Sequence, residues 1–219
     1  AQSPPSAQPL TVIEQGAVMA RVTARLIPLL FVCYIIAYLD RINVGFAKLH
    51  LREVLGVDEK VFNSVYGFGA GLFFIGYFLF EVPSNLLLQR VGARIWIARV
   101  MIFWGIVSMA MALVTGKTSF DTMRFLLGLA EAGFFPGIVL YLTYWIPARE
   151  RARNGALFMT AAPVAMLVGA PLSEALLGLD GRLGFAGWQW VFLVEGLPAV
   201  VLGVLALVVL TDRPEEARW

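Results

Sequence analysis

The stretch LIPLLFVCYIIAYLDR, residues 26–41, decides the fold class of this chain. Its first fourteen residues carry no charge, and the apolar character continues to about residue 47. A helix needs about 20 mostly apolar residues to cross about 30 Å of hydrocarbon. An isolated open strand cannot satisfy its backbone polar groups in lipid. The stretch therefore predicts a membrane-spanning helix over residues 26–47.

The composition of the whole chain indicates the same environment. Of 219 residues, 59% are hydrophobic and only 15% are charged, and the mean hydropathy is +0.78. Soluble domains have roughly 45–50% apolar and about 25% charged residues. High hydrophobicity also excludes a disordered chain. The protein is therefore predicted to be an all-α integral membrane protein.

Residue counts exclude several classes of partner and cofactor. The formal net charge is +2, and no basic run is interleaved with aromatic residues, so no nucleic-acid partner is expected. The single cysteine, Cys33, excludes an internal disulfide, and the single histidine, His50, excludes a histidine-based metal cluster. We expect neither a metal nor an organic cofactor.

Long apolar segments recur along the chain and predict six transmembrane helices. They cover residues 26–47, 61–88, 96–115, 120–144, 154–178 and 190–210. Residues 1–20 contain three prolines and three glutamines and are predicted to form a flexible tail. The six-helix bundle is predicted over residues 21–213. Tryptophans such as Trp96 and Trp104 are assigned to aromatic belts at the membrane surfaces, and glycines such as Gly76 and Gly128 to close helix packing.

Lysines and arginines are distributed unequally between the two sets of span ends. One set holds Arg21, Arg25, Arg90, Arg94, Arg99, Arg149, Arg151, Arg153, Arg213 and Arg218. The other set holds Lys48, Arg52, Lys60, Lys117 and Arg182. Cytoplasmic loops carry the excess of positive charge. The N-terminus is therefore expected in the cytoplasm of a multi-pass protein of the cell inner membrane.

Four charged residues fall inside predicted spans: Asp40 and Arg41 in the first, and Arg124 and Glu131 in the fourth. A charge at mid-bilayer costs at least about 2.5–3.5 kcal/mol, so such residues face a cavity or a partner. Arg124 and Glu131 are seven residues apart, which places them on the same helix face. We expect two acids and two bases to form a neutralising network, with either a functional or a purely structural role.

The functional interpretation is proton exchange combined with anion capture. Burial favours the protonated form of a carboxyl group and a neighbouring arginine favours the ionised form, so an ion pair that opens and closes changes proton affinity. An arginine fork also matches a carboxylate. A substrate carboxylate could then compete with Asp40 or Glu131 for an arginine. The other acids within spans, Glu81, Glu174 and Glu195, are assigned structural roles at helix ends or interfaces.

Several sequence strings resemble the anion:cation symporter family of the major facilitator superfamily, with the tartrate, phthalate and aromatic-acid branch the most similar. They are YLDRIN (38–43), EVPSNLLLQRVG (81–92), RFLLGLAEAGFFPG (124–137), YLTYWIP (141–147) and ERAR (150–153). The resemblance implies the N-terminal six-helix half of that fold. It also implies that residues 214–219 begin the central cytoplasmic linker.

The resemblance assigns roles to individual residues. Asp40 and Glu131 are expected to carry the coupling protons, and Arg41 to hold the substrate carboxylate. Arg124 is expected to be a partner of the acids.

Other residues receive roles from the same resemblance. Tyr38 and Tyr77 correspond to positions that line the central cavity, and Asn43 is a further substrate-binding candidate. Arg90 and Gly92 match the superfamily's cytoplasmic gating motif, but Gln89 stands where that motif has an aspartate, so gating contacts of that aspartate must be made otherwise or be absent.

The expected function is import of a small organic anion by a proton-coupled symporter with alternating access. The chain is expected to work with the lipid bilayer and a C-terminal six-helix half, or with a second copy of itself. A small residue at Ala162, where relatives that take sugar acids can carry an amide, favours a smaller or more apolar acid. The alternatives are a six-helix homodimeric carrier and a non-transporting binding or sensing module. No nucleophile or metal constellation in the spans indicates an enzyme.

Overall fold

The computed structural model describes residues 12–217, apart from the side chains of residues 12, 13 and 49. All regular structure in this part of the chain is helical. The α-helices are α1 (Val12–Leu55), α2 (Glu59–Val91), α3 (Ala93–Ala110), α4 (Lys117–Glu131), α5 (Phe134–Trp145), α6 (Ala148–Met159), α7 (Ala161–Leu177) and α8 (Gly187–Val209). Three short 3-10 helices, η1 (Met111–Leu113), η2 (Arg182–Gly184) and η3 (Pro214–Glu216), follow α3, α7 and α8.

The described residues form six segments that are long and apolar enough to cross a membrane, which confirms the predicted all-α membrane fold. They cover Glu14–Lys48, Glu59–Val91, Ala93–Leu113, Lys117–Trp145, Ala148–Leu177 and Gly187–Val209. The fourth segment consists of α4 and α5, and the fifth consists of α6 and α7. Neither of these two breaks was predicted from the sequence.

The first helix begins earlier than the sequence suggested. Residues 12–20, which were assigned to the flexible tail, form the first turns of α1. Met19 is 8% exposed and belongs to the main hydrophobic cluster, so this part of the helix has a packing partner. Residues 1–11 of the predicted tail lie outside the described residues.

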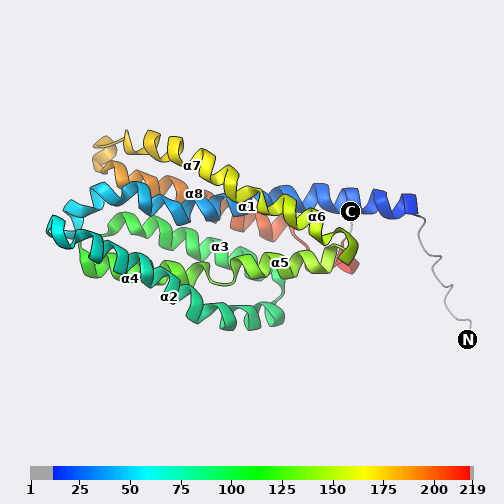
Figure 1. The fold of residues 1–219 in the computed structure, drawn as a ribbon. Coiled ribbons are helices and arrows are strands. Elements are labelled where there is room, and N and C mark those ends of the chain that lie inside the picture. The colour runs from blue at the N-terminus through cyan, green and yellow to red at the C-terminus, as the bar shows by residue number, and fades with distance from the viewer. Residues whose placement is uncertain (1–11, 218–219) are drawn as a thin grey trace, which may run out of the picture.

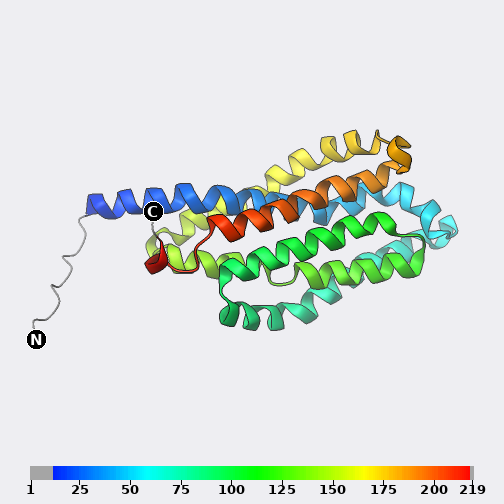
Figure 2. The same ribbon diagram turned by 180° about the vertical axis from the view of Figure 1, so that it is seen from behind.

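The helices form an elongated bundle (Figures 1 and 2). Helix α3 packs against α8, α4 and α5, while α1 packs against α7 and α8 and α2 packs against α4. Both ends of the described chain lie at one end of the bundle, which we call the terminal end (Figure 1). Large apolar side chains of α2 are exposed, among them Phe78, Leu79 and Val82, as expected for a surface that faces lipid.

Glycines allow α2 and α4 to approach closely, which confirms their predicted packing role at two positions. A Cβ atom on Gly128 would lie 1.9 Å from the carbonyl oxygen of Phe73, and one on Gly76 would lie 2.5 Å from that of Phe125. Contacts this close are open only to glycine. The crossing places Phe73 against the face of α4 that carries Arg124.

The fourth span is broken directly after Glu131. Ala132 is extended (φ −56°, ψ 129°), and Gly133 has a left-handed conformation with φ of 87°. Ser84 of α2 donates a hydrogen bond to the carbonyl oxygen of Ala132 at 2.8 Å, and Trp96 Nε1 donates to Ser84 Oγ at 3.0 Å. Irregular backbone inside a membrane needs such internal partners. Ser84 and Trp96 therefore make the break possible.

Candidate ion-pair and anion-binding site

Arg41 of α1 and Glu131 of α4 form an ion pair between two helices that are 90 residues apart in sequence. The Nη2 atom of Arg41 donates to Oε1 of Glu131. The Glu131 side chain is 2% exposed, whereas that of Arg41 is 33% exposed. The carboxylate is thus enclosed by protein, while the guanidinium still reaches the outside. Of the two partners, Arg41 is the more accessible.

Aromatic rings hold the Arg41 guanidinium in place. Its Cζ atom lies 5.5 Å from the ring centre of Tyr77 and 5.6 Å from that of Phe73. Tyr34, Phe74 and Phe135 complete, with these residues, the lining of a cavity of about 200 Å³. The cavity joins one fixed positive charge to an otherwise aromatic wall. This combination suits a small carboxylate with an apolar body.

Arg124 is buried at 3% exposure and does not form the predicted ion pair. Among the described residues, no carboxylate lies within 4.0 Å of its guanidinium. Its Cζ atom lies 4.8 Å from the ring centre of Phe73, and its Nε and Nη1 atoms are buried without a hydrogen-bond partner. Phe73 therefore faces both Arg41 and Arg124.

Asp40 is 1% exposed and is surrounded by neutral donors. Trp104 Nε1 donates to its Oδ2 at 2.7 Å, Asn43 Nδ2 donates to its Oδ1 at 3.1 Å, and the Ser108 hydroxyl donates to the same Oδ1. Three donors stabilise an ionised carboxylate without a cation. The expected network of four charges is thus present as one ion pair and two separately buried charges.

Two tryptophans do not have the predicted role at the membrane surfaces. Trp104 is fully buried in the middle of α3 and donates to Asp40, and Trp96 is 5% exposed and donates to Ser84. Trp104 and Ser108 are four residues apart and so share one helix face. That spacing was the available signal for a polar site on α3.

The remaining substrate-binding candidates lie at different places. Tyr77 lines the cavity beside Arg41. Tyr38 does not line it, but its ring contacts that of Tyr34 edge-on, with the ring centres 6.3 Å apart. Asn43 is fully buried behind Asp40. Tyr34 was not among the predicted site residues.

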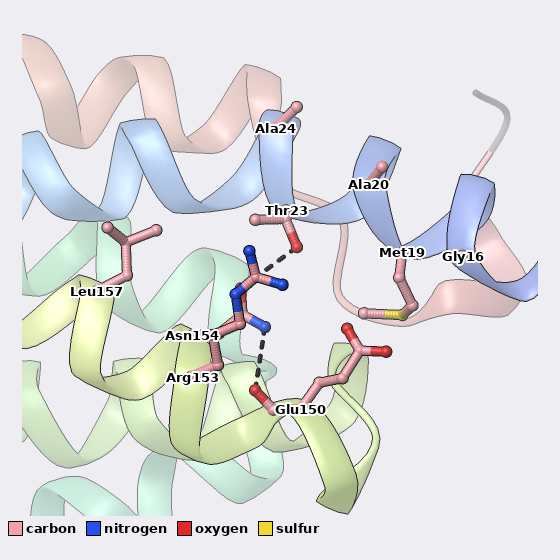
Figure 3. Close-up of a pocket in the computed structure, with 9 residues that line it drawn as sticks. All are labelled: Gly16, Met19, Ala20, Thr23, Ala24, Glu150, Arg153, Asn154 and Leu157. Carbon is pink, nitrogen blue, oxygen red and sulfur yellow. Dashed lines mark hydrogen bonds between the residues drawn. The ribbon is translucent and has the colours of Figure 1, made fainter.

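A larger cavity, of about 810 Å³, lies elsewhere, between α1 and α6 near the terminal end. Figure 3 shows its lining residues from the two helices. Thr23 donates to Asn154 Oδ1 at 3.3 Å, and Asn154 Nδ2 donates to the main-chain oxygen of Glu150 at 3.1 Å (Figure 3). None of the four charged residues discussed above lines this cavity.

The predicted gating residues lie at the terminal end, Arg90 in the last turn of α2 and Gly92 between α2 and α3. Arg90 and Gln89 are exposed. Gly92 has a φ of 93°, and a Cβ atom there would lie 2.8 Å from Oδ1 of Asp212. The same Asp212 oxygen accepts a hydrogen bond from the Arg94 main-chain nitrogen at 2.8 Å. Asp212, which was not predicted, thus provides a carboxylate at this turn, where Gln89 has none.

Within the described part of the chain, no group of three or more histidine, cysteine, aspartate or glutamate residues could hold a metal ion. Cys33 is fully buried in the main hydrophobic cluster.

Within residues 12–217, six membrane-length helical segments, a broken fourth span and an ion pair beside a small cavity define a polytopic membrane protein with an internal ionic site. The chain belongs to the Major Facilitator Superfamily, since the sequence profile of that family matches residues 30–219. This confirms the family predicted from the sequence strings.

The names of similar proteins are consistent with membership of this family. The chain is 60% identical over 202 residues to a protein of Agrobacterium vitis named "Putative tartrate transporter", covering 92% of this chain and 46% of that protein. It is 52% identical over 204 residues to the Pseudomonas putida protein named "Putative metabolite transport protein NicT", covering 93% and 46%. The chain thus spans about half the length of the curated relatives it matches. Both names agree with the prediction that the chain is not an enzyme.

Solved structures show the same fold at low sequence identity. The proton:xylose symporter XylE matches with a TM-score of 0.75 at 16% identity, covering 90% of this chain and 46% of that chain. A bacterial homologue of the human lysosomal transporter Spinster, in an inward-facing and occupied conformation, matches with a TM-score of 0.78 at 19% identity, covering 87% and 45%.

Proposed function

We propose that this chain forms half of a proton-coupled symporter that imports a small organic anion by alternating access. The observation that carries the proposal is the ion pair between Arg41, which is partly exposed at an aromatic cavity, and Glu131, which is buried. A buried acid paired with an accessible arginine links anion binding to proton binding through one contact.

The proposed cycle begins when a substrate carboxylate binds the Arg41 guanidinium. Arg41 then releases Glu131, whose charge is left without a partner in surroundings that exclude water. Glu131 takes up a proton, which offsets the negative charge that the substrate carboxylate has added to the site. The carrier can then change from one open state to the other. On the other side the proton leaves Glu131, and the restored carboxylate displaces the substrate from Arg41.

Asp40 is proposed as the second proton carrier, and Arg124 as the group that keeps the region positive. Arg124 lies near Asp40 and Glu131 in the same buried region but pairs with neither, so it can stabilise whichever acid is ionised. Phe73, which faces both arginines, would transmit movement of Arg41 to Arg124.

The substrate, the membrane and the partner half also belong to the proposal. The aromatic cavity and the name of the Agrobacterium vitis relative support a small carboxylate of the tartrate, phthalate or aromatic-acid type. The excess of arginine at the terminal end supports a cytoplasmic N-terminus in the inner membrane. Relatives of about twice the length support a second six-helix half as the partner.

The test is uptake into liposomes by the complete carrier, with tartrate and phthalate as probes. An inward proton gradient should drive accumulation of at least one probe, and a protonophore should abolish it. Accumulation driven by a sodium gradient without a proton gradient would overturn the proposed coupling. Binding of a probe without counterflow would instead support the non-transporting binding module, and activity of a pure 219-residue chain would support the homodimer.

A further inference from the structure

A small cavity, of about 140 Å³, lies between α2, α3 and the end of α4, three helices that pack against one another (Figure 1). Apart from Arg99, the exposed residues among its described lining are apolar: Phe80, Pro83, Leu87 and Phe103. Its buried lining includes Ser84, Trp96 and Ala132. The cavity therefore leads from an apolar, exposed surface to the buried groups around the break in the fourth span.

Arg99 is the one charged residue in the described lining of this cavity. Its Cζ atom lies 4.6 Å from the ring centre of Trp96. No carboxylate of the described residues lies within 4.0 Å of its guanidinium. Along α3 it continues a row of exposed apolar residues at helical spacing, formed by Ile95, Phe103 and Ile106. Arg99 thus places a positive charge on an apolar helix face, with an aromatic ring as its neighbour.

The depth of Arg99 indicates which anion it meets. It lies six residues after Ala93, where α3 begins at the terminal end, and so about 9 Å along the helix axis. An arginine this far inside a span is costly unless its long side chain reaches the headgroup region. The anion that a bilayer supplies there is the phosphate of a phospholipid, whose oxygens match the guanidinium fork.

We propose that this cavity is a binding site for one anionic phospholipid of the leaflet at the terminal end, with its phosphate on Arg99 and a short segment of one acyl chain in the cavity. The exposed Phe80, Leu87 and Phe103 contact the rest of that chain. An anionic headgroup is preferred to phosphatidylcholine, because the choline cation offsets the phosphate charge that Arg99 recognises.

Consecutive contacts connect this lipid site to the break in the fourth span. Arg99 lies over the Trp96 ring. Trp96 Nε1 donates to Ser84 Oγ at 3.0 Å, and Ser84 donates to the carbonyl oxygen of Ala132 at 2.8 Å. A lipid that holds Arg99 and fills the cavity therefore stabilises the backbone conformation directly after Glu131. An effect of the lipid on transport rests on the proposed function, whereas lipid binding itself does not.

The experiment is native mass spectrometry of the purified, complete carrier in an equimolar mixture of phosphatidylglycerol and phosphatidylcholine. The native carrier should retain one more phosphatidylglycerol than Arg99→Gln, because loss of the guanidinium lowers affinity at this site about tenfold. Ala130→Leu keeps Arg99 but adds bulk to the cavity wall, and should also lose this lipid. The control Arg21→Gln removes an exposed arginine of α1 at the same end and should retain it.

Each outcome decides the proposal. Equal retention of phosphatidylglycerol by the native carrier and Arg99→Gln overturns it, as would follow if the partner half covered the cavity. An equal loss in Arg21→Gln shows attraction to positive charge in general and also overturns it. If Ala130→Leu fails to fold, displacement of the lipid by glycerol phosphate, which lacks acyl chains, refutes the chain-binding cavity. Failure of proton-driven uptake would refute the proposed function without changing these lipid counts.

Discussion

The guanidinium of Arg41 donates to the carboxylate of Glu131, and Glu131 is the last residue of α4, directly before the break in the fourth span. The acid of the ion pair therefore sits on a helix end. Broken helices mark the binding sites of many transporters, because their ends can move while the rest of the helix stays packed. The contact thus joins the proposed anion site on α1 to the point at which the fourth span is broken.

Arg41→Lys should weaken substrate binding although it keeps the positive charge. Lysine lacks the planar fork that matches a carboxylate, and a hydrogen bond to a charged group contributes about 1.5–3 kcal/mol. We expect the apparent affinity for the transported anion to fall roughly ten- to hundredfold. Arg52→Lys, on the exposed end of α1, is the matched control. An affinity that Arg41→Lys leaves unchanged would argue against substrate binding at this guanidinium.

Glu131→Gln should abolish proton-driven accumulation. Glutamine keeps the shape and can accept from Arg41, but it can neither carry a charge nor exchange a proton. Uptake should still reach equilibrium, and exchange of internal for external anion should persist, since neither needs net proton movement. Glu59→Gln, whose side chain is 86% exposed in the native protein, is the control. Accumulation by Glu131→Gln at the native level would contradict a coupling role.

Ser84→Ala should destabilise the fold. The Ser84 hydroxyl donates to the Ala132 carbonyl oxygen and accepts from the Trp96 ring nitrogen, so the substitution leaves both of these buried groups without a hydrogen-bond partner. Each unsatisfied buried group costs about 1–3 kcal/mol. Thermal unfolding in detergent should occur at a lower temperature than in Ser64→Ala, which changes an exposed serine of the same helix. Similar unfolding temperatures would mean that another group donates a hydrogen bond to the main chain at the break.

Gly133→Ala should be more damaging than another glycine-to-alanine change in a membrane segment. The backbone there is left-handed, at a φ of 87°, and a Cβ atom would lie 1.9 Å from Ser84 Oγ. The left-handed conformation alone costs a non-glycine residue about 1–2 kcal/mol. Gly71→Ala is the control, because no atom lies within 4 Å of its Cβ position. Folded yield and unfolding temperature should fall for Gly133→Ala only.

Asp212→Ala should loosen the start of α3. The Asp212 carboxylate accepts from the main-chain nitrogen of Arg94, in the first turn of α3, at 2.8 Å. Loss of such a cap costs about 0.5–2 kcal/mol. Amide hydrogen exchange should accelerate over residues 92–96. Asp58→Ala is the control, because Asp58 precedes α2 without a side-chain capping hydrogen bond. Unchanged exchange in Asp212→Ala would show that water or another group caps the helix.

The span positions and the family could be predicted because both depend on local sequence. About twenty apolar residues in a row require a helix in lipid whatever surrounds them. The strings around Asp40 and Arg124 indicated the family, and the four charged residues were correctly placed inside spans.

The contacts between those charges could not be predicted. Which acid meets which arginine depends on how helices turn about their own axes and where they cross. Arg124 and Glu131 share a helix face in sequence, yet Arg124 faces Phe73 and Glu131 faces Arg41. The glycines that bring α2 against α4 place Phe73 against Arg124, and their contact partners are distant in sequence.

The sequence by itself thus determined the environment, the number of spans and the charged residues that need an internal partner, because lipid penalises each unpaired charge wherever it lies. Only the tertiary structure decided that Trp104 and Ser108 donate to Asp40, and that Ser84 donates to the main chain at the break after Glu131. The physical reason is that hydrogen bonds are short and directional. They form only between groups that helix packing has already brought together.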